Sequence, residues 1–183
     1  LDLNTDNRGL IFDIFIELGK SKKINEINSQ SISTLKRSNK LINNSFKKDR
    51  LISKKFIQIL KSEQNLSSIL RTMKNVGVLQ SYIPDFAEIV GQMQFDLFHI
   101  FTVDEHTFKV VRNMRQMKIN YSDEFRLENE LIKKIPKIEI LYIAGLFHDL
   151  GKGKGGNHSE IGAKISRDFA KRLGLSLADS DLI

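Results

Sequence analysis

His148 and Asp149 are adjacent in the chain and are the pair best placed to do chemistry. They lie in a strongly apolar segment, residues 138–150, which predicts a buried helix. Burying an imidazole and a carboxylate without partners costs several kcal/mol, and a divalent cation with nitrogen and oxygen ligands would offset that cost. The pair therefore indicates a metal site. A hydrogen-bonded histidine on an ordinary helix is the alternative that the residues alone leave open.

Two further histidines are candidate ligands for such a site. His106 lies in the first turns of one expected helix, and His158 lies at the start of another. His99 precedes Thr102 and is flanked by an aromatic residue, so packing or capping is an alternative role for it. The chain has no cysteine, which excludes a disulfide framework, a thiolate zinc site and a cysteine nucleophile.

The segment between His148 and His158 contains four glycines and two lysines, Lys152 and Lys154. Glycines allow sharp turns and a close approach of the backbone to a ligand. Two lysines beside a metal would suit an anionic substrate such as a phosphate ester. The segment is not a P-loop, because GxxxxGK[ST] is missing, and a flexible surface linker is the alternative interpretation.

Helical periodicity accounts for most of the chain, which has only two prolines. The predicted helices are residues 10–20, a segment that begins at Ser31 or Ser33, and residues 47–63, 66–80, 103–117, 123–133, 138–150 and 158–173. Few segments alternate with period two, so we expect little or no sheet. The predicted fold is all-α.

Several residues predict where these helices begin, end and face the core. Thr102–Glu105 and Asn157–Glu160 have the form of capping boxes, and Asp6 or Asn7 suits the first helix start. The predicted terminators are Gly19, Gly77, Gly151 and Gly174. The apolar stripe predicted for residues 47–63 consists of Leu51, Ile52, Phe56, Ile59 and Leu60.

Charge and hydropathy exclude some classes of protein. The formal net charge is +7, and residues 1–90 carry 15 basic and 9 acidic side chains. We interpret this excess as solvated helix faces, because few aromatic residues accompany the basic ones, and we predict no nucleic-acid partner. No apolar run approaches the roughly 20 residues that span a bilayer, and the start is no signal peptide, so we predict a cytoplasmic protein with no membrane partner. Lacking an initiator Met and a closing element, the chain is expected to be a fragment.

Two long strings carry a family resemblance. MQFDLFHIFTVDEHTFKVVRNM and LFHDLGKGKGGNHSEIGAKISRDFAKRLGLS closely resemble the HD domain of the bifunctional PII uridylyltransferase/uridylyl-removing enzymes. The resemblance implies an all-α, metal-dependent phosphohydrolase bundle over residues 85–183, truncated at its C-terminus. Residues 1–84 would then be the helical segment that precedes it.

The resemblance also assigns roles to residues. His106 matches the first metal-binding histidine of the HD signature, and His148 with Asp149 matches its His-Asp pair. His158 matches an additional histidine of the family, for a second metal or the substrate phosphate. The implied catalytic residues are His148, Asp149 and Lys152, and the implied cofactor is one or two Mg²⁺ or Mn²⁺ ions.

The remaining matches are less defined. His99 and Lys154, together with Lys152, are expected on the substrate side, while Asp104 and Glu105 match the string without an assigned role. The family's closing aspartate would follow the end of the chain. Asp179 and Asp181 have the sequence context of capping residues and do not match that ligand.

The resemblance implies hydrolysis of the bond that joins UMP to a tyrosine of the PII signalling protein, whose uridylylated form would be the partner. Glutamine would act through ACT domains, which this chain is too short to contain. The nucleotidyltransferase motif, a Gly-Ser followed by an Asp-x-Asp pair, does not occur. The alternatives are an HD hydrolase of small nucleotides and a non-catalytic docking module with an incomplete HD site.

Overall fold

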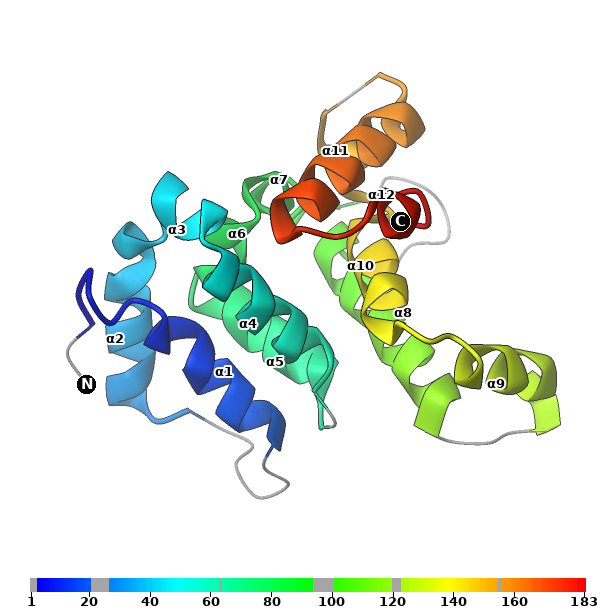
Figure 1. Ribbon diagram of the computed structural model, residues 1–183, viewed down its shortest axis with the longest axis horizontal. Coiled ribbons are helices and arrows are strands. Elements are labelled where there is room, and N and C mark those ends of the chain that lie inside the picture. Colours follow the sequence, from blue (N-terminus) through cyan, green and yellow to red (C-terminus); the bar gives the residue numbers. More distant parts are fainter. Residues whose placement is uncertain (1–2, 21–26, 63, 94–100, 120–122, 155) are drawn as a thin grey trace.

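A computed structural model describes residues 3–20, 27–62, 64–93, 101–119, 123–154 and 156–183 (Figure 1). Within these ranges every regular element is a helix, and the only extended pairing is an isolated bridge between Met93 and Thr102. The all-α prediction is confirmed. None of the described helices has both the length and the apolar character needed to cross a bilayer.

Among the described residues, seven short α-helices form the first part of the chain, on the left of Figure 1. They are α1 (Leu10–Lys20), α2 (Ser29–Ser38), α3 (Asn44–Lys48), α4 (Arg50–Leu60), α5 (Leu66–Asn75), α6 (Val78–Tyr82) and α7 (Pro84–Ala87), with a 3₁₀ turn η1 (Asn39–Leu41) after α2. Asn28 caps α2, so that helix begins before the predicted Ser31. The predicted single helix over residues 47–63 is two helices, because the side chain of Asp49 caps a new start and accepts from the backbone N–H of Leu51.

The second part has five α-helices within the described ranges. They are α8 (Val103–Ile119), α9 (Arg126–Lys133), α10 (Ile138–Phe147), α11 (His158–Leu173) and α12 (Leu177–Ser180), with 3₁₀ turns η2 (Asp123–Phe125) and η3 (Leu150–Lys154). Helix α11 has the predicted bounds and ends at Gly174, whose φ of +80° is the left-handed conformation that favours glycine. Helix α10 ends earlier than predicted, at Phe147, and Gly151 lies inside η3 instead of ending the helix.

Ser176 caps α12, a role that the sequence assigned to its aspartates. The Ser176 hydroxyl accepts from the backbone N–H of Asp179, while the Asp179 carboxylate pairs with Lys137 at 2.6 Å.

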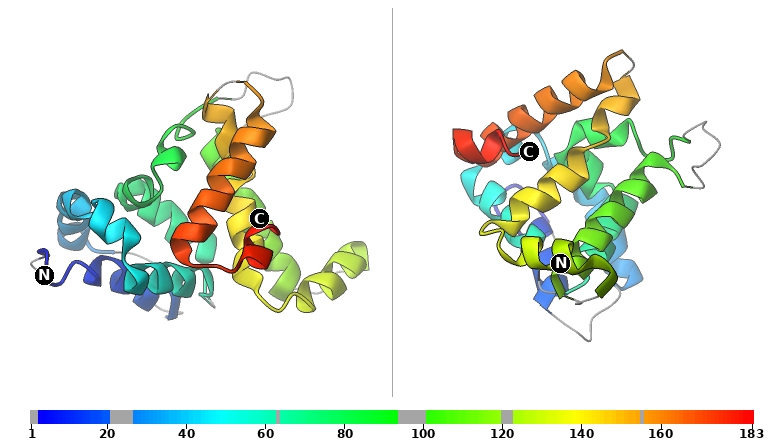
Figure 2. Two further views of the ribbon diagram at one scale, coloured as in Figure 1. Left: turned by 45° about the horizontal axis from the view of Figure 1, so that its top comes forward. Right: turned by 90° about the vertical axis from the view of Figure 1, so that its right-hand side faces the viewer.

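One aromatic cluster joins the two parts of the chain. The ring centroid of Tyr82 lies 4.9 Å from Phe12 and 5.0 Å from Phe56, and Phe56 lies 5.7 Å from Phe169 of α11. All four side chains are buried in a single core. The C-terminal half of α11, which carries Phe169, therefore packs against the first group of helices (Figure 2).

Helix α4 shows which residues of the predicted apolar stripe face that core. Ile52, Phe56, Ile59 and Leu60 are buried, as the period of the helix requires. Leu51 is 59% exposed, so its predicted core position is wrong. It occupies the first turn of α4, directly after the cap at Asp49, on the side that faces solvent.

Phe56→Ala is expected to lower the free energy of unfolding by about 3–5 kcal/mol, because it removes a buried ring from the centre of the aromatic cluster. Leu51→Ala, on the same helix, should change it by no more than about 0.5 kcal/mol. Urea unfolding followed by circular dichroism measures both. Equal losses for the two variants would contradict the described face of α4.

Candidate metal centre

His106, His148 and Asp149 converge at one place between α8 and α10. His148 follows the last residue of α10, and His106 lies in the first turn of α8, which packs along α10. Asp149 Oδ2 lies 3.2 Å from His148 Nε2 and 3.8 Å from His106 Nε2. One ligand atom from each of the three residues lies within 4.8 Å of the other two. The geometry thus unites three of the four metal ligands that the sequence predicts.

Asp149 is the buried member of this group, with only 7% of the residue exposed. Its Oδ2 atom is buried and accepts no hydrogen bond from the described residues, although two imidazole nitrogens stand near it. A buried carboxylate oxygen without a partner is costly. A divalent cation with two imidazole nitrogens and this oxygen as ligands would satisfy it, so the donor set fits such an ion.

The backbone of α10 fixes the tautomer of His148. Its Nδ1 lies 2.8 Å from the carbonyl oxygen of Gly145, which can only accept, so Nδ1 carries the hydrogen. Neutral His148 therefore presents the lone pair of Nε2 to the side of Asp149. This is the arrangement in which a backbone carbonyl orients a metal-binding histidine.

The two ionisable groups shift each other's pKa. Burial alone would lower the pKa of His148, but the adjacent Asp149 carboxylate and the Gly145 carbonyl together raise it above its ordinary value. Burial alone would raise the pKa of Asp149, yet His148 and Lys152 hold it well below the usual range. Asp149 is thus a carboxylate over the ordinary pH range, as a metal ligand must be.

The two lysines of η3 take different directions. Lys152 Nζ lies 2.9 Å from Asp149 Oδ1, so the carboxylate has one oxygen on Lys152 and the other facing the histidines. Lys154 Nζ lies 2.9 Å from Asp85 and 3.0 Å from Glu88, both outside the three-residue cluster. Lys152 belongs to the candidate centre, whereas the structure pairs Lys154 with α7 and its C-cap.

His158 and His99 are not part of the described cluster. His158 begins α11 with an exposed side chain, and the three-residue group found among the described residues does not include it. His99 lies outside the residues that the structure describes. The roles of both remain predictions.

The glycine-rich segment folds back on the protein. A Cβ atom on Gly151 would lie 2.0 Å from the carbonyl oxygen of His158, so only glycine allows η3 to pack this closely on the start of α11. The sequence suggested a close approach of this backbone to a ligand, whereas the close approach at Gly151 is to the backbone of α11. It positions Lys152 next to Asp149.

Two residues of α5 that the sequence did not single out hold the start of α8. Lys74 Nζ lies 2.9 Å from the buried carboxylate of Asp104 and 2.8 Å from Glu105. Arg71 contributes a second bond to Glu105, at 2.9 Å. The predicted capping-box glutamate is therefore engaged with α5, and His106 follows it directly in the chain.

These contacts also set the protonation of Asp104. Burial opposes its ionisation, but its hydrogen bonds, including the one from Lys74, outweigh burial and hold its pKa below the ordinary value. A carboxyl with a lowered pKa in the folded state stabilises the fold above its unfolded pKa. That stabilisation is lost as the pH falls through the folded pKa.

Lys74→Met should lower the free energy of unfolding by about 3 kcal/mol at pH 7, because it leaves Asp104 buried without its cation. The difference from the parent chain should shrink as the pH falls from about 7 to about 3, since Asp104 then becomes protonated in the variant. Urea unfolding across this pH range measures the effect. Lys36→Met, an exposed position on α2 with no ion pair described, is the control, and a pH-independent difference would contradict the Lys74–Asp104 interaction.

His106→Ala should weaken Mn²⁺ binding about 100-fold, because it removes one of three converging ligand atoms. His158→Ala should leave the Mn²⁺ affinity of this three-residue cluster unchanged, since its side chain lies outside the cluster. Isothermal titration calorimetry with MnCl₂ measures both affinities. Unchanged binding in His106→Ala would contradict the cluster, and equal loss in His158→Ala would add that residue to it.

Comparison with known proteins gives matches over both parts of the chain. Residues 2–82 match the family model described as the uridylyltransferase GlnD third domain, and residues 103–183 match that of the HD domain. The chain is 41% identical over 174 residues to the bifunctional uridylyltransferase/uridylyl-removing enzyme of Ectopseudomonas mendocina, and 40% identical to that of Azotobacter vinelandii. Each alignment covers 94% of this chain and 19% of the relative, so the chain spans about a fifth of their length.

Proposed function

Because the chain belongs to the family of bifunctional uridylyltransferase/uridylyl-removing enzymes through its GlnD third domain and its HD domain, we propose that it removes UMP from a PII signalling protein. The bond hydrolysed is the phosphodiester between UMP and a tyrosine. The observation that carries the proposal is the buried Asp149 Oδ2, which lies 3.2 Å and 3.8 Å from two imidazole Nε2 atoms and accepts no hydrogen bond from the described residues. We divide the chain accordingly into residues 1–84 and an HD domain over residues 85–183, and we place the reaction in the cytoplasm.

His106, His148 and Asp149 would hold one Mg²⁺ or Mn²⁺ ion through the Nε2 atoms and Oδ2. A bound divalent cation supplies Lewis-acid polarisation of the phosphoryl oxygens and lowers the pKa of a water. His158, at the start of α11, is assigned to a second ion or to the substrate phosphate. Its exposed position is compatible with a ligand that arrives from solvent.

The chain's own residues would orient the metal ligands and compensate the negative charge of the phosphoryl oxygens. In the reaction a water oxygen forms the new bond to phosphorus and the bond from phosphorus to the tyrosyl oxygen breaks, which yields UMP and the tyrosine hydroxyl. Lys152, held 2.9 Å from Asp149 Oδ1, supplies the positive charge next to the phosphoryl oxygens. The Gly145 carbonyl keeps His148 in the tautomer that the site requires.

The partners follow from the same assignment. Uridylylated PII is the substrate, glutamine is the effector through domains that the family carries beyond the matched segment, and no nucleic acid is required. His99 is assigned to the substrate side, within a family string that precedes α8. Lys154 no longer has that role in our proposal, because it pairs with Asp85 and Glu88.

Asp149→Asn and His148→Ala should lower UMP release from uridylylated PII, in Mn²⁺ or Mg²⁺, by about a hundredfold or more, because each removes a converging ligand atom. Asp181→Asn, at an exposed carboxylate beside α12, should retain the parent rate. Chromatographic quantification of UMP measures release, with the present chain and with one extended at its C-terminus. Circular dichroism confirms that each variant is folded.

The same assay separates the alternatives. Retained activity in Asp149→Asn would contradict the assignment. Hydrolysis of free nucleotides without release of UMP from PII would favour a small-nucleotide hydrolase. Metal binding without either activity, in the extended chain as well, would favour a docking module.

A further inference from the structure

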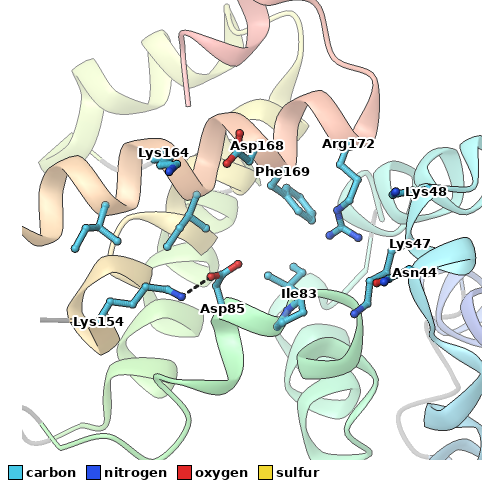
Figure 3. A pocket seen from close by; sticks show the side chains of 13 residues that line it. Asn44, Lys47, Lys48, Ile83, Asp85, Lys154, Lys164, Asp168, Phe169 and Arg172 are labelled. Atoms are coloured by element: carbon cyan, nitrogen blue, oxygen red, sulfur yellow. Dashed lines mark ion pairs between the residues drawn. The ribbon is translucent and has the colours of Figure 1, made fainter.

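A cavity of about 590 Å³ lies between α3, α7 and α11 (Figure 3). This volume is within the roughly 300–1,000 Å³ that small-molecule sites occupy. Five basic and two acidic side chains line the cavity, so its lining has a formal net charge of +3. The charged residues are Lys47, Lys48, Lys154, Lys164, Arg172, Asp85 and Asp168. None of the three residues of the candidate metal centre belongs to the lining.

Most of this positive charge has no anionic partner among the described residues. Lys154 is neutralised by Asp85, as the dashed line in Figure 3 shows, and by Glu88. Within the described part of the chain, Lys47, Lys48 and Lys164 make no ion pair. They come from two elements far apart in sequence, α3 and α11, and meet across the cavity.

Arg172 is held at the cavity by its aromatic neighbours. Its guanidinium carbon lies 4.4 Å from the ring centroid of Tyr82 and 4.7 Å from that of Phe169. Nη2 donates to the carbonyl oxygen of Tyr82 at 2.9 Å, whereas Nη1 is buried and has no hydrogen-bond partner among the described residues. An oriented guanidinium with one unused donor suits a phosphate oxygen.

In the absence of a bound anion, the cations that line the cavity repel one another. Burial lowers the pKa of Lys47, and the positive charge of Arg172 lowers it further. Burial likewise lowers the pKa of Arg172. Like charges that are brought together and partly desolvated destabilise the fold, and a bound anion would relieve this cost.

The rest of the lining is apolar. Ile83 and Pro84 precede and begin α7, and Ile161 and Ile165 lie one turn apart on α11. In Figure 3, Lys47, Lys48 and Arg172 lie at one end of the cavity and Lys154 and Lys164 at the other, with Ile83 between them. Basic side chains next to branched aliphatic ones fit a ligand that joins a phosphate to a less polar ring. Inorganic phosphate alone would leave this surface uncovered.

We propose that this cavity binds a phosphorylated small molecule of nucleotide size, with its phosphate on Lys47, Lys48 and Arg172 and its ring on Ile83, Ile161 and Ile165. The site is distinct from the candidate metal centre and does not rest on the proposed hydrolysis of uridylylated PII. Both sites share η3, which carries Lys152 at the metal centre and Lys154 at the cavity.

Isothermal titration calorimetry with UMP, ATP and pyrophosphate tests the proposal. The protein is the 183-residue chain with Asp149→Asn, in chelator, so that the metal centre does not contribute. At least one nucleotide should bind saturably at one site, more tightly than pyrophosphate, and binding should weaken with added salt. Equal affinity for pyrophosphate and both nucleotides would overturn the role of the apolar surface. No binding of any of the three would overturn the site.

The double variant Lys47→Gln/Lys48→Gln should weaken nucleotide binding about tenfold, because it removes two cations that have no ion pair among the described residues. Lys171→Gln is the control, since Lys171 is an exposed lysine of α11 that does not line the cavity. Equal weakening in the control, or none in the double variant, would place the ligand elsewhere.

The double variant should unfold at the same temperature as the parent or higher, and the bound nucleotide should raise the parent's unfolding temperature. If the double variant unfolds at a temperature well below that of the parent, the two lysines stabilise the fold. That result would overturn their assignment as binding residues.

Discussion

The burial of the Asp149 carboxylate is the constraint on which the other features of the candidate centre depend. One oxygen is neutralised by Lys152, and the other is buried between two imidazoles and accepts no hydrogen bond from the residues that the structure describes. Burial follows from the apolar helix α10, which ends just before the pair, and from the close packing of η3 on α11 at Gly151. A cation at this point would compensate the negative charge of a carboxylate that is already ionised and buried in the folded protein.

The first part of the chain contributes to this arrangement from a distance. Lys74 and Arg71 of α5 hold the acidic start of α8, which determines where His106 stands relative to Asp149. The aromatic contacts between Tyr82, Phe56 and Phe169 hold α11 to the same group of helices. The two family matches therefore cover two stretches of sequence that share one common core.

The sequence predicted the features that depend on residues close together in the chain. His148 next to Asp149 at the end of an apolar segment, and the bounds of α11, are visible because the signals lie within a few residues. Leu51 was assigned to the core because helical spacing alone does not show which edge of a stripe faces solvent. The Lys74–Asp104 pair joins residues 30 positions apart, and Lys154 meets Asp85 only after α7 and η3 pack, so neither had a local signal. The cavity likewise depends on the meeting of α3 and α11.

Anomalous diffraction from crystals of the chain grown or soaked with Mn²⁺ tests the central claim most directly, because it locates the ion without reference to activity. The account predicts a Mn²⁺ peak within bonding distance, about 2.0–2.3 Å, of His106 Nε2, His148 Nε2 and Asp149 Oδ2. A peak bound by other side chains, or no peak here under conditions in which calorimetry shows saturation, would contradict it.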